Sequence, residues 1–358
     1  MKKLIVFIIA FFFIGVTHAY ALPNNKLSVL IVFKSKIDHQ LVNSAGGVIK
    51  GELKNFPIII ADLPKEKIIA LKKNYNIDLI EEDGVWSATA QTLPWGINRV
   101  GAEVAQSQGI TGKGIKVGVL DSGISTHEDL IIAGGWNFIN NTSNCQDDLG
   151  HGTHVAGIIS AVDNNIGVVG AAPNVQIYAL KVLDNQGNAN WSTIAKAIDW
   201  AITNRINVLN MSFGGNTGSK TIERVLKKAN DSGILLVAAV GNQGNNAGVN
   251  YPAKYETVIA VGATDMHDKL AGFSNTGTEL ELVAPGVDIS STYLGNSYIN
   301  LSGTSMAVPH VTGVAALIWS INPTLNNKEV RDRLKQSTID LGIPGVDNYY
   351  GNGLIKYR

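Results

Sequence analysis

The sequence has little cysteine, no excess of charge of either sign, and no long unbroken run of hydrophobic residues beyond its N-terminus. Its single cysteine, Cys145, excludes a framework of internal disulfides, and we interpret this residue as an incidental thiol in a polar loop. Lysine and arginine total 29, as do aspartate and glutamate, so the formal net charge is zero. A balanced chain of this kind gives no indication of a nucleic acid or an anionic membrane surface as a partner.

Glycine and apolar side chains, in contrast, are abundant. The 358 residues include 38 glycines, while 45% of the residues are hydrophobic and only 16% are charged. This composition is typical of a globular α/β protein with many tight turns. The length is sufficient for one large domain and a small one.

Residues 1–21 have the pattern of a secretory signal peptide. Two lysines precede an apolar run over residues 4–16, and Ala19-Tyr20-Ala21 has small residues at the two positions that a signal peptidase reads. The run is short for a membrane span, which disfavours the alternative of an uncleaved anchor. We therefore predict cleavage after Ala21, export from the cell, and no stable membrane association afterwards.

Residues 26–89 are predicted to form a small α+β unit. Apolar alternation and helical spacing predict the order β-α-β-β-α-β, with strands over 27–33, 48–53, 56–61 and 77–80 and helices over 37–44 and 65–75. This is the order of a ferredoxin-like domain. By itself the block indicates no function.

From Gly114 onward, buried strands alternate with helices. Short apolar runs and helical patterns predict strands over 115–120, 176–183, 207–211, 234–240 and 258–263 and helices over 151–161, 192–204, 221–231, 304–319 and 326–337. Alternation of this kind predicts an α/β fold, a doubly wound and mostly parallel sheet with helices on both faces. Ligands of such sheets bind beyond the carboxyl ends of the strands, where the strand order reverses.

Three polar residues stand where such a sheet would present a site. Asp121 ends a fully apolar strand, His151 lies between two glycines at the start of a helix, and Ser305 begins a helix within Gly303-Thr304-Ser305-Met306-Ala307. These are the parts of a nucleophilic triad, in which serine attacks, histidine transfers the proton and aspartate orients the histidine. Taken alone, Ser305 could be a helix cap, but its two partners favour a nucleophile.

Two other enzyme classes fit the sequence less well. His151 and His154 could both face a metal ion, but there is no His-Glu-x-x-His pattern and no third ligand nearby in sequence. We therefore interpret His154, and likewise His310, as structural. An α/β-hydrolase esterase would place its serine in Gly-x-Ser-x-Gly, whereas this chain has Gly-Thr-Ser-Met-Ala. A metal-dependent hydrolase and an esterase of that fold are thus disfavoured.

With these residues in view, the chain resembles the precursor of a subtilisin-type serine protease, a subtilase. The resemblance rests on Asp121-Ser122-Gly123-Ile124, Gly150-His151-Gly152-Thr153-His154 and the Ser305 segment, in that order, and covers nearly everything after the signal peptide. It implies a subtilisin-like catalytic domain over 90–358. It also implies a prodomain over 26–89 that assists folding and inhibits the enzyme until it is removed.

The resemblance further implies an oxyanion donor and a substrate cleft. Asn242 follows a predicted buried strand and stands where the family has an amide that donates to the developing oxyanion. The segment 210–215 resembles one whose backbone pairs with an extended peptide substrate. The primary pocket, which takes the side chain of the substrate residue just before the cleaved bond, would then be lined by Ser212, Phe213, Gly214, Ala239 and Gly241.

Asn250 departs from many bacterial relatives, which have glycine there, and its side chain should make the primary pocket shallower and more polar. The first substrate implied by the resemblance is the C-terminus of the prodomain, cut after Thr89. Thr89 would fill the narrowed pocket, and Trp86 would occupy an apolar subsite near Phe213 and Trp191. We therefore expect small or β-branched residues at the cleaved position and large apolar ones three residues before it.

A calcium site is the remaining implication of the resemblance. Gln91, Asp129 and the loop 162–168 match the tight site of the family. Its ligands would be the side-chain oxygens of Gln91, Asp129 and Asn164 and the backbone carbonyls of Val162, Ile166 and Val168. All-oxygen ligation with flexible geometry suits Ca²⁺.

Together these features predict a secreted serine endopeptidase that is made as a self-processing zymogen. We expect it to act on polypeptides as a monomer, with its own prodomain as inhibitor. The alternative from another class is a catalytically silent subtilase scaffold that binds peptides or partner proteins. The four catalytic positions, Asp121, His151, Ser305 and Asn242, are all filled, which favours the enzyme.

Overall fold

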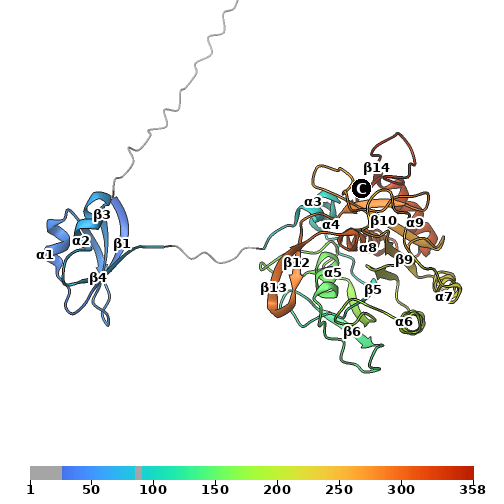
Figure 1. Ribbon diagram of the computed structural model, residues 1–358, viewed down its shortest axis with the longest axis horizontal. Coiled ribbons are helices and arrows are strands. Elements are labelled where there is room, and N and C mark those ends of the chain that lie inside the picture. The colour runs from blue at the N-terminus through green and yellow to red at the C-terminus, as the bar shows by residue number, and fades with distance from the viewer. Residues whose placement is uncertain (1–25, 85–90) are drawn as a thin grey trace, which may run out of the picture. The chain divides into compact units, whose positions relative to one another are not determined.

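The computed structural model describes residues 26–84 and 91–358. The chain divides into two compact units, with the boundary between Ala88 and Thr89 (Figure 1). The predicted signal peptide and the predicted cleavage site, including Trp86 and Thr89, lie outside the described residues.

The described part of the first unit is an antiparallel sheet with two helices. In chain order its elements are β1 (Lys26–Phe33), α1 (His39–Ser44), β2 (Val48–Glu52), β3 (Ile58–Pro64), α2 (Lys65–Leu71) and β4 (Ile77–Glu82). The strand order is β2-β3-β1-β4, and each pair of neighbours is antiparallel. This is the order of helices and strands that the sequence predicts.

Alternate residues of β1 and β3 build the core of the first unit, because successive side chains of a strand point to opposite faces. Ile31 and Ile59 are fully buried there. Helix α2 ends at Leu71, earlier than predicted. The side chain of Asn74 accepts a hydrogen bond from Asn76 N at 2.9 Å, and this local turn competes with the helix.

The second unit alternates strands and helices around one large sheet. Its helices and strands in chain order are α3 (Trp95–Arg99), α4 (Ala102–Ser107), β5 (Lys116–Asp121), β6 (Ile132–Asn137), α5 (His151–Ser160), β7 (Gln176–Lys181), α6 (Trp191–Thr203), β8 (Val208–Met211), α7 (Lys220–Asp231), β9 (Leu235–Ala239), β10 (Val258–Thr264), β11 (Leu282–Pro285), β12 (Ile289–Tyr293), β13 (Ser297–Leu301), α8 (Thr304–Ile321), α9 (Asn327–Gln336), β14 (Thr338–Ile339) and β15 (Leu354–Ile355).

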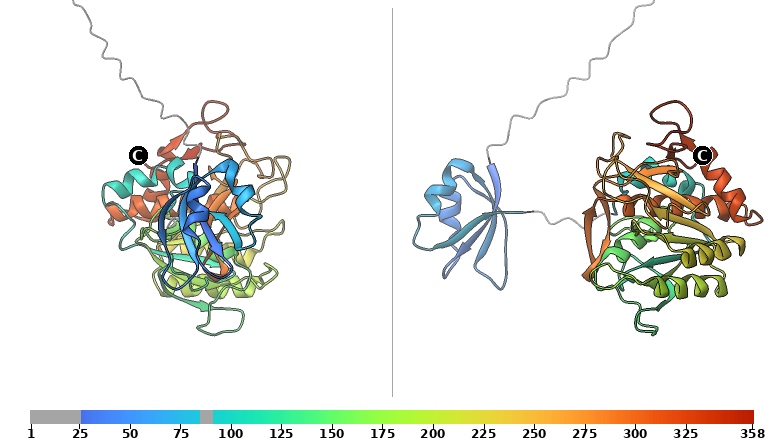
Figure 2. Two further views of the ribbon diagram at one scale, coloured as in Figure 1. Left: turned by 90° about the vertical axis from the view of Figure 1, so that its left-hand side faces the viewer. Right: turned by 45° about the vertical axis from the view of Figure 1, so that its right-hand side comes forward.

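The described strands of the large sheet follow the order β14-β15-β11-β10-β9-β8-β5-β7-β6. Neighbours are parallel except for β14 with β15. Helices α5 and α8 belong to the hydrophobic core on one face, and α6 and α7 belong to the core on the other (Figures 1 and 2). The predicted doubly wound, mostly parallel α/β sheet is therefore confirmed.

The strand order reverses beside β5. After β7 the chain crosses to the other side of β5 and continues with β8, β9 and β10. Such a reversal opens a crevice at the carboxyl ends of the two strands that flank it. The structure therefore favours a site beyond the ends of β5 and β8.

Helix α8 is the longest helix of the described residues, and most of it is buried. Among the described residues it is the one helix long and apolar enough to cross a membrane by length and composition, and 83% of that stretch is buried inside the fold. Its apolar residues face the sheet and α5 rather than solvent. Its first turn nevertheless reaches the carboxyl edge of the sheet, where Ser305 lies.

The hairpin of β12 and β13 has little signal in the sequence, because its strands are rich in serine and tyrosine rather than in apolar runs. Hydrogen bonds from its hydroxyl groups attach the hairpin to α5. The hydroxyls of Ser291 and Thr292 donate to the carbonyl oxygens of His154 at 2.7 Å and Thr153 at 2.8 Å. These bonds hold the outer side of the helix that begins at His151.

Candidate active site

Three parallel strands end side by side at one edge of the large sheet. The register pairs Leu120 of β5 with Met211 of β8, and β8 pairs in the same way with β9. The residues that follow these pairs, Asp121, Ser212 and Ala239, therefore lie at neighbouring strand ends. This is the edge at which the strand order reverses.

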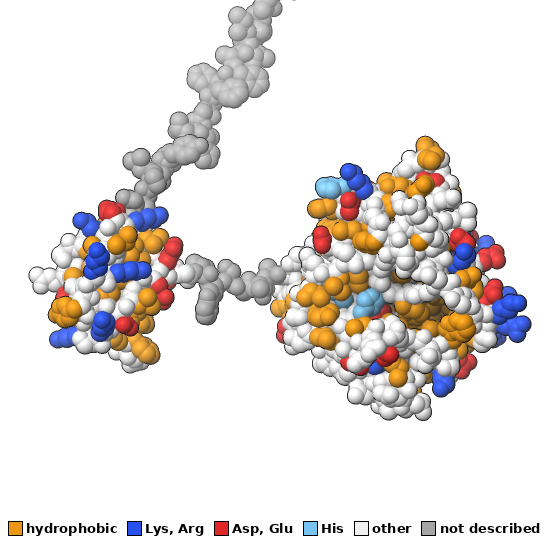
Figure 3. Space-filling model, viewed as in Figure 1, with side chains coloured by type: hydrophobic (Ala, Val, Ile, Leu, Met, Phe, Trp, Pro, Cys, Tyr) orange, Lys and Arg blue, Asp and Glu red, His pale blue; other side chains and the backbone are white. Residues whose placement is uncertain are grey.

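Two helices begin at the same edge. His151 is the first residue of α5 and Ser305 is the second residue of α8, and the two helices pack against each other. The face of this unit in Figure 3 has a hollow lined by apolar side chains, with a histidine side chain beside it. Residues that are far apart in sequence are thus brought to one region.

Asp121 and His151 are hydrogen-bonded, with 2.8 Å between Oδ1 and Nδ1. Asp121 is fully buried, and its Oδ1 also accepts from Ser122 N at 2.7 Å and Ser122 Oγ at 3.2 Å. Burial lowers the pKa of His151, but the charge and hydrogen bond of Asp121 outweigh it, with a further contribution from Asp147, and the pKa is raised. Because Nδ1 is held in this way, Nε2 is left to exchange protons with another group.

The close approach of α5 to the Asp121 turn depends on a glycine. A Cβ on Gly152 would lie 2.1 Å from the carbonyl oxygen of Gly123, so a larger residue would push the helix away. The backbone N of Gly152 donates instead to Ser122 Oγ at 2.9 Å. This bond joins the turn after β5 to the first turn of α5.

Asp147 acts as the cap of α5, although it lies upstream of the usual capping position. Its Oδ1 accepts from Leu149 N at 3.0 Å and Gly150 N at 2.8 Å, and its Oδ2 accepts from Thr153 N at 2.8 Å and Thr153 Oγ1 at 2.7 Å. Donors at a helix start need such acceptors. Asp147 therefore fixes the point at which the helix, and with it His151, begins.

Ser305 is held in a reciprocal contact with Ser212. Ser305 Oγ donates to Ser212 O at 2.8 Å, and Ser212 Oγ donates to Ser305 O at 2.9 Å. No hydrogen bond joins Ser305 to His151 among the described residues. A rotation of the serine side chain would release its hydroxyl from Ser212, and such bonds in ligand-free enzymes often form only with substrate.

Asn242 presents its amide nitrogen beside the backbone of Ser305. Its Oδ1 accepts from Thr304 N at 2.9 Å and Thr304 Oγ1 at 2.8 Å, which fixes the orientation of the amide. Asn242 Nδ2 and Ser305 N lie 3.4 and 3.7 Å from the point where a Cβ of Gly303 would stand. Neither nitrogen donates to a described residue, so together they can receive a developing negative oxygen.

The family of the chain can now be stated. Residues 112–353 match the model of the subtilase family of peptidases. This chain is a subtilase. Its relatives bear the names of alkaline proteases and subtilisins, and like them it is a serine endopeptidase.

Curated relatives align with nearly the whole subtilase chain. It is 44% identical over 356 residues to a thermostable alkaline protease of Halalkalibacterium halodurans, covering 99% of this chain and 97% of the relative. Identity to subtilisin E of Bacillus subtilis is 45% over 323 residues, covering 89% of this chain and 84% of the relative. Identity to alkaline elastase YaB of a Bacillus strain is 47% over 300 residues, covering 84% and 78%.

Asn250 lies beside both predicted walls of the primary pocket of this subtilase. A Cβ on Gly214 would lie 3.3 Å from the Cβ of Asn250, and a Cβ on Gly241 would lie 2.5 Å from its Nδ2. Asn250 thus stands between the two predicted walls. Its Nδ2 donates to Gln243 Oε1 at 3.0 Å, and Asn275 Nδ2 donates to the same oxygen at 2.7 Å, so the amide is part of a polar network.

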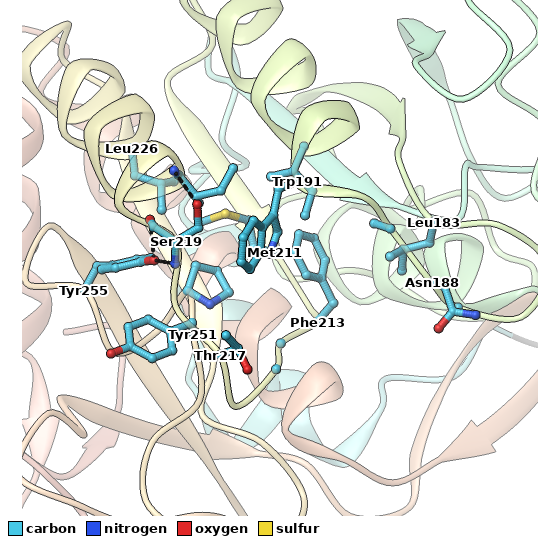
Figure 4. Close-up of a pocket in the computed structure, with 17 residues that line it drawn as sticks. Leu183, Asn188, Trp191, Met211, Phe213, Thr217, Ser219, Leu226, Tyr251 and Tyr255 are labelled. Carbon is cyan, nitrogen blue, oxygen red and sulfur yellow. Dashed lines mark hydrogen bonds between the residues drawn. The ribbon is translucent and has the colours of Figure 1, made fainter.

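A second, apolar pocket of about 250 Å³ lies between α6, α7 and the segment after β8 (Figure 4). Trp191 and Phe213 lie on one side of it and Met211 lies deeper, as the sticks in Figure 4 show. Tyr255 Oη is hydrogen-bonded to both Ser219 N at 2.7 Å and Ser219 O at 2.8 Å, which fixes the opposite wall. The predicted neighbours of an apolar subsite, Phe213 and Trp191, therefore do line one pocket.

The six predicted calcium ligands also come together. Gln91 Nε2 donates to Val162 O at 2.6 Å and Val168 O at 3.1 Å. Asn164 Nδ2 donates to Asp129 Oδ1 at 3.0 Å, and Ile166 N donates to Asn164 Oδ1 at 3.0 Å. No group of three or more His, Cys, Asp or Glu side chains that could hold a metal ion occurs in residues 26–84 and 91–358.

Three residues that the sequence did not single out now belong to the site. Ser122 bonds to the carboxylate of Asp121, Asp147 caps the helix of His151, and Lys181 donates to Ser122 O. The sequence carried one indication that Lys181 has polar partners. It lies in the apolar stretch at the end of β7, and a lysine that is buried there needs a partner. Ser122 lay inside a motif and Asp147 lay three residues before one, but neither carried a signal of its own.

Proposed function

We propose that this subtilase hydrolyses peptide bonds with Asp121, His151 and Ser305 as its triad. Ser305 Oγ attacks the substrate carbonyl while His151 Nε2 takes the hydroxyl proton, and Asp121 stabilises the resulting imidazolium. The imidazolium then gives its proton to the leaving amine. The observation that carries the proposal is the 2.8 Å hydrogen bond from His151 to a fully buried Asp121 at the same sheet edge as Ser305.

Asn242 and the backbone of Ser305 supply the second requirement of this reaction. As the carbonyl becomes tetrahedral, its oxygen acquires negative charge, and fixed donors stabilise that charge more than they stabilise the neutral carbonyl. Asn242 Nδ2 and Ser305 N are fixed donors that face one small space. Water then attacks the acyl-enzyme by the same route, with His151 again as base.

The pH dependence of the reaction follows from the state of His151. Attack requires a neutral imidazole, and the charge of Asp121 raises the pKa of His151. Below that raised pKa the histidine is protonated and cannot accept the hydroxyl proton of Ser305. We therefore expect kcat/KM to rise with pH through the raised pKa, towards neutral and alkaline conditions.

The proposal includes synthesis as a secreted zymogen. Residues 1–21 would direct export, residues 26–89 would act as folding assistant and inhibitor, and cleavage after Thr89 would release the enzyme 90–358. The division of the chain into two compact units supports such an arrangement. The similarity of the chain to the minor extracellular protease Epr of Bacillus subtilis, 39% identical over 355 residues, supports export.

The substrate preference that we propose is for small or β-branched residues at the cleaved position. The position of Asn250 beside Gly214 and Gly241 supports this, because a side chain there would reduce the depth of the primary pocket. The apolar pocket beside Trp191 and Phe213 would take a large side chain three residues before the cleaved position. Burial of an aromatic side chain there would contribute roughly 2 kcal/mol to binding.

Calcium is proposed as a structural ligand of the loop after α5. Burial raises the pKa of Asp129, against hydrogen bonds from Val168 and Asn164 that lower it, so its carboxylate would gain from a nearby cation. The carbonyls of Val162 and Val168 converge on the Gln91 amide, whose rotation would replace its nitrogen with an oxygen. With Asn164 and Ile166 O, this donor set fits the oxygen ligation of Ca²⁺.

The test is expression of the full chain beside its Ser305→Ala variant. The wild type should appear as a processed form of about residues 90–358 that is labelled by a fluorophosphonate, while the variant should stay at precursor length and unlabelled. Equal processing of both would show that another protease matures the chain. A wild type that is not labelled would overturn the proposal in favour of a silent, peptide-binding scaffold.

A further inference from the structure

Lys181 is a buried charge beside the proposed triad that the reaction does not use. This residue ends β7 and pairs in register with Asp121 on β5. It is only 3% exposed, and it is the one buried lysine in the described part of the chain. Burial of an ammonium group away from water destabilises the fold unless each of its protons has an acceptor.

All three protons of the Lys181 ammonium have acceptors. Nζ donates to Ser122 O at 2.5 Å, Asp148 Oδ1 at 2.6 Å and Leu183 O at 3.3 Å. The bond to Asp148 is an ion pair in which the lysine is buried and the carboxylate is half exposed. The group is therefore fixed in position rather than free to sample solvent.

Two of these acceptors belong to the turns that carry the acid and the base. Ser122 follows Asp121 and donates both its N and Oγ to the carboxylate. Asp148 lies in the short loop that leads into α5, beside Asp147, which caps that helix. One ammonium group therefore ties the turn after β5 to the loop before His151.

We propose that Lys181 is a positioning residue for the Asp121–His151 pair. By holding Ser122 on one side and Asp148 on the other, it fixes the distance between the two turns and hence the 2.8 Å contact between Oδ1 and Nδ1. Misplacement of a catalytic group by about 1 Å can reduce the rate roughly 10²-fold. The inference rests on the proposed function, because the pair matters only if it transfers protons.

The experiment compares Lys181→Met with Lys181→Arg and with a matched control, Lys116→Met. Lys116 begins β5 at the opposite edge of the same sheet, where its Nζ donates to Asn204 O at 3.2 Å. The full chain is expressed, active sites are counted with a fluorophosphonate, and kcat and KM are measured for each counted site. A purely structural role would lower the number of active sites but leave the kcat of each one unchanged.

Lys181→Met should lower kcat per active site by about 10- to 100-fold with KM nearly unchanged. Lys181→Arg should recover part of the loss, and Lys116→Met should match the wild type. A kcat for Lys181→Met within twofold of the wild type would overturn the inference. If Lys181→Met does not fold, Asp148→Ala decides, because it removes one anchor at a half-exposed position: unchanged kcat would overturn the inference, and a severalfold loss would support it.

A readout that needs no turnover separates this inference from the proposed function. The proton of His151 Nδ1, held by Asp121, should give a low-field resonance in the NMR spectrum of the wild type. Lys181→Met should shift or broaden this resonance while Lys116→Met leaves it in place. An inactive wild type would overturn the proposed function, whereas an unchanged resonance and kcat in Lys181→Met would overturn only the role of Lys181.

Discussion

The two halves of the proposed active site are prepared to different degrees before substrate arrives. In the acid–base half, Asp121 and His151 are bonded at 2.8 Å and their neighbours are tied together by buried polar contacts. In the nucleophile half, Ser305 Oγ is bonded to Ser212 O, and Asn242 Nδ2 has no acceptor among the described residues. The orientation of the base is thus a property of the folded chain, whereas the contact between Ser305 Oγ and His151 and the acceptor of the oxyanion donors come only with the substrate.

The largest loss of activity should come from a substitution in the acid–base half. Asp121→Asn replaces the acceptor of the His151 Nδ1 proton by an amide, which favours the wrong tautomer and should lower kcat about 10⁴-fold. The measurement is kcat and KM on a peptide substrate after the variant precursor has been processed by added wild-type enzyme. Asp199→Asn, an exposed change on α6, serves as control. A loss below tenfold would contradict the role of Asp121.

A substitution in the nucleophile half should lower activity less. Asn242→Ala removes one of two oxyanion donors and should lower kcat by about 10²- to 10³-fold, with little change in KM because the donor acts mainly on the transition state. Asn242→Asp keeps the acceptor for Thr304 but loses the donor, so it should lose at least as much. Full activity in Asn242→Asp would show that the residue serves only to hold Thr304.

Calcium removal tests how the acid–base half is stabilised, because the loop 162–168 follows the end of α5, the helix that begins at His151. With calcium at about 1,000 times its Kd, removal should cost about 4 kcal/mol of stability, and roughly 10 °C in unfolding midpoint. The measurement is thermal unfolding of fluorophosphonate-blocked enzyme with calcium and with EDTA. Asp129→Asn should abolish the difference. A midpoint that EDTA does not move would refute the site.

The smallest effect should come from a substitution in the predicted primary pocket, which lies beside the nucleophile half. Asn250→Gly removes the side chain between Gly214 and Gly241, so the pocket should deepen and accept larger residues. We expect kcat/KM for phenylalanine at the cleaved position to rise roughly 10-fold relative to threonine. A peptide library profiled with both enzymes measures the ratio. A wild-type profile already dominated by phenylalanine or tyrosine would show that Asn250 does not limit the pocket.

The sequence was sufficient for the α/β fold class, for five of the nine strands of the large sheet (β5, β7, β8, β9 and β10), and for the residues at the ends of strands and the starts of helices that form the site. Asp121 and His151 could be found because an acidic residue after an apolar strand and a histidine between glycines have local signals. The roles of Asp147 and Lys181 could not, since each depends on which backbone groups the folded chain places around it. The strands of the hairpin β12–β13 were missed for a related reason, because they attach by hydroxyl bonds rather than by apolar burial.

The burial of α8 has a consequence for how long the enzyme survives its own activity. The helix that carries Ser305 packs against β8, β9, β10 and α5, so the amide protons of its turns beyond the first should exchange with solvent only when the whole second unit opens. No partly open form would then expose this segment to cleavage by a neighbouring molecule. The working lifetime should therefore be set by the rate of global unfolding, as a kinetic rather than an equilibrium property.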